Sequence, residues 1–166
     1  VIGESIARLY NNDMKKLLAA MFVALLMVGC GGDDRMAVRK IKEAKENGAT
    51  ELYLSNDQIS DLSSLTGLTN LERLYLSNNQ ISDLSPLTEL TNLEWLDLSG
   101  NPITDLSPLK GLTNLKRLFF SNNPISDLSP LAGLTNLEFL YFYDNPIPDD
   151  QKAMLRKALP NCDISF

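Results

Sequence analysis

The chain has 166 residues, of which 44% are hydrophobic and 22% are charged, and these proportions exclude both a wholly disordered chain and a protein built mainly from membrane helices. The formal net charge of −6 argues against nucleic-acid binding, which needs a basic surface. The sequence has no histidine, so the commonest general base and the commonest metal ligand are both missing. We therefore expect one small domain that is not an enzyme and binds no cofactor or metal.

The N-terminal region has the layout of an export signal. Residues 1–13 precede the first methionine, Met14, and we expect them to be absent from the natural protein. After Met14, two lysines are followed by thirteen uncharged residues, from Leu17 to Gly29. A run of this length fits a signal peptide, which needs about 7 to 15 apolar residues, and is too short for a transmembrane helix, which needs about 20. We predict a signal peptide over residues 14–29.

The end of the apolar run, Met27-Val28-Gly29-Cys30, resembles the lipobox of bacterial lipoproteins, although that family prefers leucine and a small residue where Met27 and Val28 stand. The resemblance implies that Cys30 is lipidated and begins the mature protein, with residues 30–35 as a short tether and the protein held in the bacterial cell envelope. The outer membrane or cell surface is the favoured location. An ordinary signal peptide or an uncleaved anchor is the alternative. Cys162 would then be unpaired, and a disulfide with Cys30 is the less favoured possibility.

A helix is predicted over residues 36–48, because Val38, Ile41, Ala44 and Lys45 recur at helical spacing and Asn47-Gly48 is a typical helix end. We expect this helix to cover the N-terminal end of the domain that follows.

Residues 49–147 repeat five times with a period of 22 residues, which indicates a solenoid. The repeating positions include two columns of aliphatic residues: Leu74, Leu96, Leu118 and Leu140, and Ile59, Ile81, Ile103, Ile125 and Ile147. One full unit, residues 71–92, resembles the 22-residue leucine-rich repeat of internalins and of a regulatory subunit of protein phosphatase 1. The resemblance implies an α/β solenoid of right-handed coils, with a parallel concave sheet and short 3-10 or irregular helices on the convex side.

Each repeat position has an expected physical role. Leu74 and Leu76 alternate with Tyr75, so a short strand should place the leucines inward and the tyrosine outward. By resemblance to the family, an inward asparagine in each repeat bonds the backbone of adjacent coils; these are Asn79, Asn101, Asn123 and Asn145. The first repeat has Asp57 instead, which fits a unit next to a cap. Pro86, Pro108 and Pro130 suit the first turn of a short helix.

One column of aspartates, Asp61, Asp83, Asp105 and Asp127, suggests two interpretations. Stacked carboxylates could bind calcium. Each one also lies just before a Leu-Ser turn, where its oxygens can accept hydrogen bonds from backbone N–H groups. We favour this capping role over a metal site.

The C-terminal cap is predicted over residues 148–166. Pro148 and Asp149 open a segment that places Met154, Leu155, Ala158 and Leu159 on one side, and a short strand-like end, residues 164–166, follows Pro160. Phe166 should belong to this cap, whereas Phe120 and Phe142 should replace core leucines.

The outward strand positions form three columns on the concave face. The first is Glu51, Arg73, Trp95, Arg117 and Phe139; the second is Tyr53, Tyr75, Asp97, Phe119 and Tyr141; the third is Ser55, Ser77, Ser99, Ser121 and Tyr143. Seven of the ten aromatic residues after Cys30 lie in these columns, where the core does not need them. Exposed tyrosine, tryptophan and arginine are typical of protein-interface hot spots.

We therefore predict that the concave face binds a protein or peptide, and that its contact residues are Tyr53, Arg73, Tyr75, Trp95, Asp97, Arg117, Phe119, Phe139, Tyr141 and Tyr143. One alternative is purely structural packing of the rings across the strands. Another is a structural or adhesive surface protein that contacts carbohydrate. An enzyme is the least favoured, since its only candidate acid pair, Glu51 and Asp97, lies two strands apart.

Overall fold

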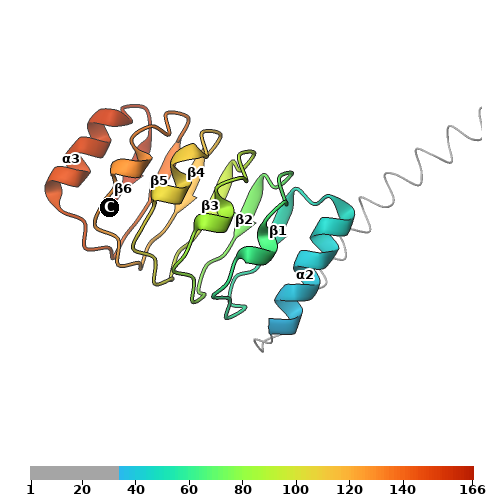
Figure 1. The fold of residues 1–166 in the computed structure, drawn as a ribbon. Helices are drawn as coiled ribbons and strands as arrows, with labels where there is room; N and C mark the ends of the chain where they lie inside the picture. The colour runs from blue at the N-terminus through green and yellow to red at the C-terminus, as the bar shows by residue number, and fades with distance from the viewer. Residues whose placement is uncertain (1–33) are drawn as a thin grey trace, which may run out of the picture. The chain divides into compact units, whose positions relative to one another are not determined.

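The structure is a computed structural model that describes residues 34–166; the predictions for residues 1–33, including the signal peptide and Cys30, lie outside the described residues. This part of the chain forms one six-stranded parallel sheet between two helices (Figure 1). The helices are α2 (Asp34–Asn47) and α3 (Asp149–Ala158). The strands are β1 (Glu51–Tyr53), β2 (Arg73–Tyr75), β3 (Trp95–Asp97), β4 (Arg117–Phe119), β5 (Phe139–Tyr141) and β6 (Asp163–Ser165). Short 3-10 helices follow the first four strands: η1 (Ser63–Leu65), η2 (Ser85–Leu87), η3 (Ser107–Gly111) and η4 (Ser129–Leu131).

The strands stack in chain order, each one paired with the strand of the next coil (Figure 1). From β1 to β5 the register joins residues that are 22 positions apart, such as Leu74 with Leu96 and Leu96 with Leu118. This confirms the predicted solenoid, in which every repeat is one coil; the first four coils have a strand and a 3-10 helix, and in the fifth α3 follows the strand.

The core is a continuous column of aliphatic side chains inside the coils. Leu74, Leu96 and Leu118 are fully buried, as expected from the alternation of each strand. Phe120 and Phe142 replace leucines in the last coils, and their rings stack at 5.1 Å, which confirms their predicted core positions.

The predicted asparagine ladder is present. The amide of Asn101 donates to the carbonyl of Leu98 at 2.9 Å and to the carbonyl of Leu76, in the preceding coil, at 3.0 Å, and its Oδ1 accepts from the N–H of Ile81 at 3.0 Å. Asn79 and Asn123 repeat the pattern. The ladder therefore satisfies buried backbone groups of each coil with a side chain of the next.

A second asparagine ladder was not predicted from the sequence. It lies on the surface, where Asn92, Asn114 and Asn136 donate to threonine carbonyl groups one coil back, at distances of 2.8 to 2.9 Å. These exposed bonds connect neighbouring coils at the surface, whereas the first ladder connects them in the core.

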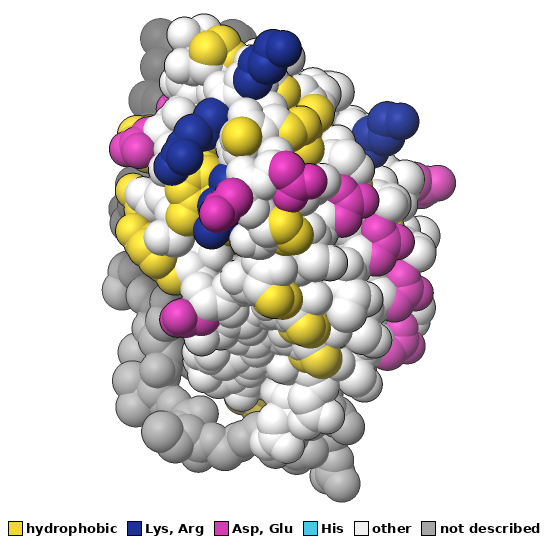
Figure 2. Space-filling view, turned by 90° about the vertical axis from the view of Figure 1, so that its left-hand side faces the viewer, with side chains coloured by type: hydrophobic (Ala, Val, Ile, Leu, Met, Phe, Trp, Pro, Cys, Tyr) yellow, Lys and Arg dark blue, Asp and Glu magenta, His cyan; other side chains and the backbone are white. Residues whose placement is uncertain are grey.

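The aspartate column has the predicted capping role. Each aspartate accepts a hydrogen bond of 2.8 Å from the backbone N–H of the serine two residues later, which is the first residue of the 3-10 helix. The four aspartates are Asp61, Asp83, Asp105 and Asp127. Pro86, Pro108 and Pro130 lie in the first turns of those helices, as predicted. Acidic side chains form a row along one side of the domain (Figure 2).

Helix α2 lies at the N-terminal end and packs on β1 and η1. It buries Ala37, Ile41 and Ala44, but Val38 is 61% exposed, so the predicted core position of Val38 is wrong. The buried stripe follows a spacing of four and three residues from Ala37, which turns Val38 toward solvent. Lys40 of α2 pairs with Asp57 at 2.6 Å, which explains why the first repeat has an acid in place of the ladder asparagine.

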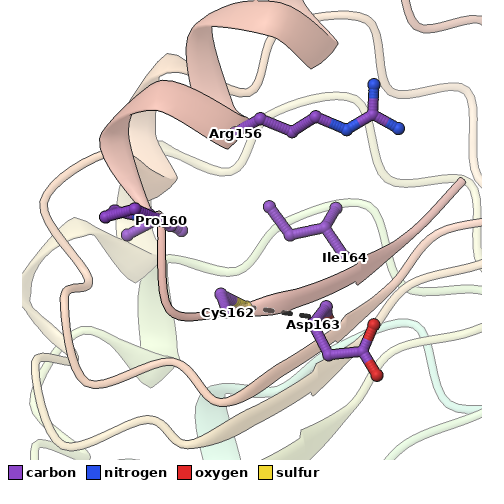
Figure 3. Close-up of a pocket in the computed structure, with 6 residues that line it drawn as sticks. Arg156, Pro160, Cys162, Asp163 and Ile164 are labelled. Carbon is purple, nitrogen blue, oxygen red and sulfur yellow. Dashed lines mark hydrogen bonds between the residues drawn. The ribbon is translucent and has the colours of Figure 1, made fainter.

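The C-terminal cap is α3 followed by β6. Leu155 and Leu159 are buried, and Phe166 contacts the ring of Phe142 edge-on at 4.6 Å, so the predicted cap is confirmed. A hollow beside β6 is lined by Arg156, Pro160, Cys162, Asp163 and Ile164, among others (Figure 3). Burial, with the negative charge of Asp163, raises the pKa of the Cys162 thiol to about 11, so it stays protonated at neutral pH.

Candidate functional site

The candidate site is the face of the sheet that points away from the core. In β1, β3 and β5 the two outer residues are half-buried and the middle leucine is buried. The strand register aligns the members of each of the first two predicted columns across neighbouring strands, for example Trp95 with Arg117 in the first column and Phe119 with Tyr141 in the second. The predicted contact residues on the strands are therefore brought together on one surface.

Five rings form a continuous aromatic row across the sheet: Tyr53, Tyr75, Trp95, Phe119 and Tyr141. The first two stack at 4.5 Å and the last two at 5.2 Å, each pair with an interplanar angle of 6°. Trp95 joins the halves, with its ring centroid 5.8 Å from Tyr75 and 5.0 Å from Phe119. The row thus includes the cross-strand packing that the structural alternative expected.

Trp95 reaches this row from the neighbouring column. The register position in line with Tyr75 and Phe119 is Asp97, which interrupts the second column. Trp95 belongs to the first column, and its ring fills the interruption. Sequence spacing alone did not reveal this crossing, because register fixes the position of a Cα atom but not the direction of a long side chain.

Arg117 lies between two rings. Its Cζ atom is 5.2 Å from the ring centroid of Trp95 and 5.2 Å from that of Phe139, and these residues are its register partners on both sides. Within residues 34–166, Arg117 makes no ion pair with a carboxylate. We call this arrangement the arginine stack, formed by Trp95, Arg117 and Phe139.

Arg73 occupies the same position two strands away but has a different environment. It forms an ion pair with Glu51, its register partner on β1. Glu51 also accepts a hydrogen bond from the Tyr53 hydroxyl at 3.0 Å. Burial and this hydrogen bond raise the pKa of Tyr53 to about 12, so the hydroxyl remains a donor. The charges at the N-terminal end of the face are therefore already satisfied within the domain.

The indole N–H of Trp95 is buried and has no hydrogen-bond acceptor among the described residues. A buried donor without an acceptor costs about 1–3 kcal/mol. Trp95 therefore carries a polar group that no described residue satisfies.

The remaining predicted residues belong to the same face, with Asp97 on the central strand β3. Asp97 accepts a hydrogen bond from the backbone N–H of Ser99 at 3.0 Å, and the Ser77 hydroxyl donates to that of Ser55 at 2.8 Å. Tyr143 ends the third column and is 48% exposed. Ser55 and Ser77 are thus bonded to each other, whereas Tyr143 offers a ring to solvent.

The described residues give little support to catalytic or metal chemistry. Glu51 is engaged by Arg73 and Tyr53, and Asp97 by its own turn, so they do not form an acid pair. Across residues 34–166, no three side chains from Asp, Glu, Cys or His gather as a metal site would require. In the same range, no helix combines the length and apolarity needed to cross a membrane.

Short parallel strands repeated every 22 residues, with helices at both ends, define a solenoid repeat protein. The family of leucine rich repeats (2 copies) matches this chain at residues 50–89, 91–133 and 113–157. The chain belongs to the leucine-rich-repeat family. Such repeats commonly form protein-interaction modules and are typically not enzymes.

Solved structures support an internalin-like fold. An internalin of Listeria monocytogenes, InlF, is 34% identical over 69% of this chain, with a TM-score of 0.63. A leucine-rich-repeat protein of Leptospira interrogans is 35% identical over 76% of this chain, with a TM-score of 0.69. This chain spans 33% of the length of each. A search of the curated proteins found no match.

Proposed function

We propose that the protein is a non-enzymatic binding module that holds a protein or peptide against the concave face, through the aromatic row and the arginine stack. The observation that carries the proposal is the chemistry of this face: large rings, and an arginine that pairs with no carboxylate of residues 34–166, lie outside a core that the leucines already fill. Such groups combine a large contact area with polar tips and are enriched in interface hot spots.

The ring contacts across the strands also stabilise the sheet, but they do not account for every feature. Cross-strand pairs contribute roughly 0.2–1 kcal/mol each. The buried indole donor of Trp95 has an opposing cost of about 1–3 kcal/mol. Buried polar groups normally have a hydrogen-bond partner, and a residue such as Trp95 that departs from this rule is expected at a functional surface.

The test compares Trp95→Ala and Tyr141→Ala with a surface control, Lys110→Ala, in the full chain. Lys110 is exposed on η3, away from the strands. Linear peptides selected for binding to the wild-type protein from a random library should bind the two ring variants about 30-fold or more weakly, as hot spots do, and the control equally well. The control should unfold at the wild-type temperature, and the ring variants should unfold at a lower temperature but remain folded at the temperature of the binding assay. If both ring variants melt, the rings are structural and the proposed surface is wrong.

The stacking geometry favours a protein over a carbohydrate partner. A sugar ring packs on an exposed aromatic face, whereas Tyr53 and Tyr75, and likewise Phe119 and Tyr141, cover each other's faces at 6°. Their edges and tips remain for contact, and these suit the mixed apolar and polar groups of a polypeptide. Binding to a glycan array that is lost in Tyr141→Ala would contradict this preference.

We also propose that Cys30 is lipidated and anchors the protein in a bacterial envelope, the outer membrane or the cell surface. The support is the sequence alone: the charged start, the apolar run and the lipobox-like residues before Cys30. The intact mass of protein from a bacterial membrane fraction should correspond to a chain that begins at Cys30 and carries acyl groups. A Cys30→Ser variant should lose them, and an unmodified, soluble wild-type chain would contradict the anchor.

A further inference from the structure

We infer that the arginine stack is a receptor for one carboxylate, the side chain of an aspartate or glutamate in an extended segment of the partner. This inference rests on the proposed binding function of the concave face and names the chemistry that the face recognises. It depends on the difference between two arginines at equivalent positions of the repeat.

The comparison of Arg73 with Arg117 shows which of them is available. Arg73 is neutralised by Glu51, its register partner. Arg117 has tryptophan and phenylalanine as register partners, and no carboxylate pairs with it within residues 34–166. Of these two cations on the concave face, only Arg117 is free to take an anion from outside.

The two rings prepare Arg117 for this role. With Trp95 and Phe139 each at 5.2 Å from its Cζ atom, the guanidinium is held between apolar surfaces, and its N–H edge remains for a ligand. A planar guanidinium edge matches a carboxylate with two parallel hydrogen bonds. The rings also restrict the side chain before binding, which reduces the entropy lost when the ligand is held.

The surrounding charge favours a single carboxylate over a phosphate or a polyanion. The chain has a net charge of −6, and Asp97 lies on the neighbouring strand, in register with Phe119, two residues beyond Arg117. A group with two negative charges is repelled more strongly by this field than a group with one. Next to the arginine stack, the aromatic row can contact apolar residues of the partner that flank its acidic residue.

The experiment uses the sole tryptophan of the chain, Trp95, whose fluorescence reports directly on the arginine stack. Tryptophan-free peptides selected for binding to the full chain are compared with versions in which the acidic residue is replaced by its amide. Both are titrated against the wild type, Arg117→Gln and the control Lys110→Gln, which removes one exposed positive charge on η3, outside the strands. A further variant, Arg117→Lys, keeps the positive charge but lacks the planar fork.

We expect the acidic peptide to lose about 10- to 100-fold in affinity on Arg117→Gln and to lose less on Arg117→Lys. It should bind Lys110→Gln within about twofold of wild type. The amide peptide should bind the wild type and Arg117→Gln equally. Selected peptides that depend on Tyr141 but bind Arg117→Gln as well as wild type would overturn the carboxylate receptor and leave the proposed function intact. Phosphorylated peptides that bind more tightly than acidic ones would also overturn it. Peptides that ignore both Arg117 and Tyr141 would overturn the proposed function itself.

Discussion

Replacing Asn101 by alanine tests how the coils are held together. Asn101 is 4% exposed, and its side chain makes hydrogen bonds within its own coil and to the preceding coil. Its Oδ1 accepts from the N–H of Ile81 at 3.0 Å, and its amide donates to the carbonyls of Leu76 and Leu98 at 3.0 and 2.9 Å. The alanine variant removes all of these bonds at one buried position.

The expected cost follows from what each backbone group retains. The Leu76 carbonyl keeps the amide of Asn79 at 2.9 Å, and the Leu98 carbonyl keeps that of Asn123 at 3.1 Å. The Ile81 N–H has no replacement in the ladder, so a buried donor is left without an acceptor, at a cost of about 1–3 kcal/mol. The Leu76 and Leu98 carbonyls each lose one of their hydrogen-bond donors as well. The free energy of unfolding should therefore fall by roughly 2–4 kcal/mol, a large part of the about 5–15 kcal/mol of a typical domain.

Urea unfolding of the full chain, followed by circular dichroism, measures this loss. The matched control is Asn92→Ala, which removes one exposed bond of 2.8 Å to the Thr69 carbonyl and should cost less than about 1 kcal/mol. The midpoint of Asn101→Ala should fall by about 1–2 M at an unchanged slope. A loss no greater than that of the control would refute the assigned role of the buried ladder.

Two further predictions concern turns. Gly100 has φ +68°, and a Cβ there would lie 2.5 Å from Asn78 Oδ1, so Gly100→Ala should lower the unfolding free energy by about 1–3 kcal/mol. The control is Gly67→Ala, at φ +85° with open space around it, which should show only the cost of the backbone conformation. An equal loss in both variants would exclude a contribution from the contact with Asn78. Hydrogen bonds from Ser85 hold the pKa of Asp83 below its ordinary value of 3.8. The stabilisation is therefore complete above about pH 4 and is lost as pH falls through the folded-state pKa. Asp83→Asn keeps an acceptor that does not titrate, so its urea midpoint should fall less steeply than wild type below pH 4, and identical slopes would contradict the assignment.

The period of the sequence was sufficient to predict the fold, because each coil contacts only its neighbours and a 22-residue repeat places every equivalent residue in the same environment. The buried leucines were predicted from this pattern, the inward asparagines from the resemblance to the family, and the capping aspartates from their place before each Leu-Ser turn; the structure confirms all three. Even Asp57, which departs from the pattern, was correctly connected with the cap, since Lys40 of α2 pairs with it.

Features outside the repeat were harder to predict. In α2, Ala37 and Val38 are both small apolar residues, and the sequence does not show which of them faces a neighbour; the structure buries Ala37 and exposes Val38. The surface ladder of Asn92 and its equivalents was missed because an exposed asparagine in a loop has many possible partners. These positions are decided by side-chain direction and tertiary contact, which periodicity does not encode.

The difference between positions that the repeat fixes and positions that it leaves variable explains why the candidate binding surface lies where the repeat is irregular. The core allows little variation, because a changed leucine leaves a cavity or a clash in every adjacent coil. The outward strand positions have no such constraint, and there a tryptophan stands beside an arginine while an aspartate interrupts a column of rings. Trp95 fills that interruption, and the result is one aromatic row beside Arg117, which pairs with no carboxylate of residues 34–166. A repeat selected only for stability has no reason to place these three departures next to one another, and their conjunction is what a specific ligand requires.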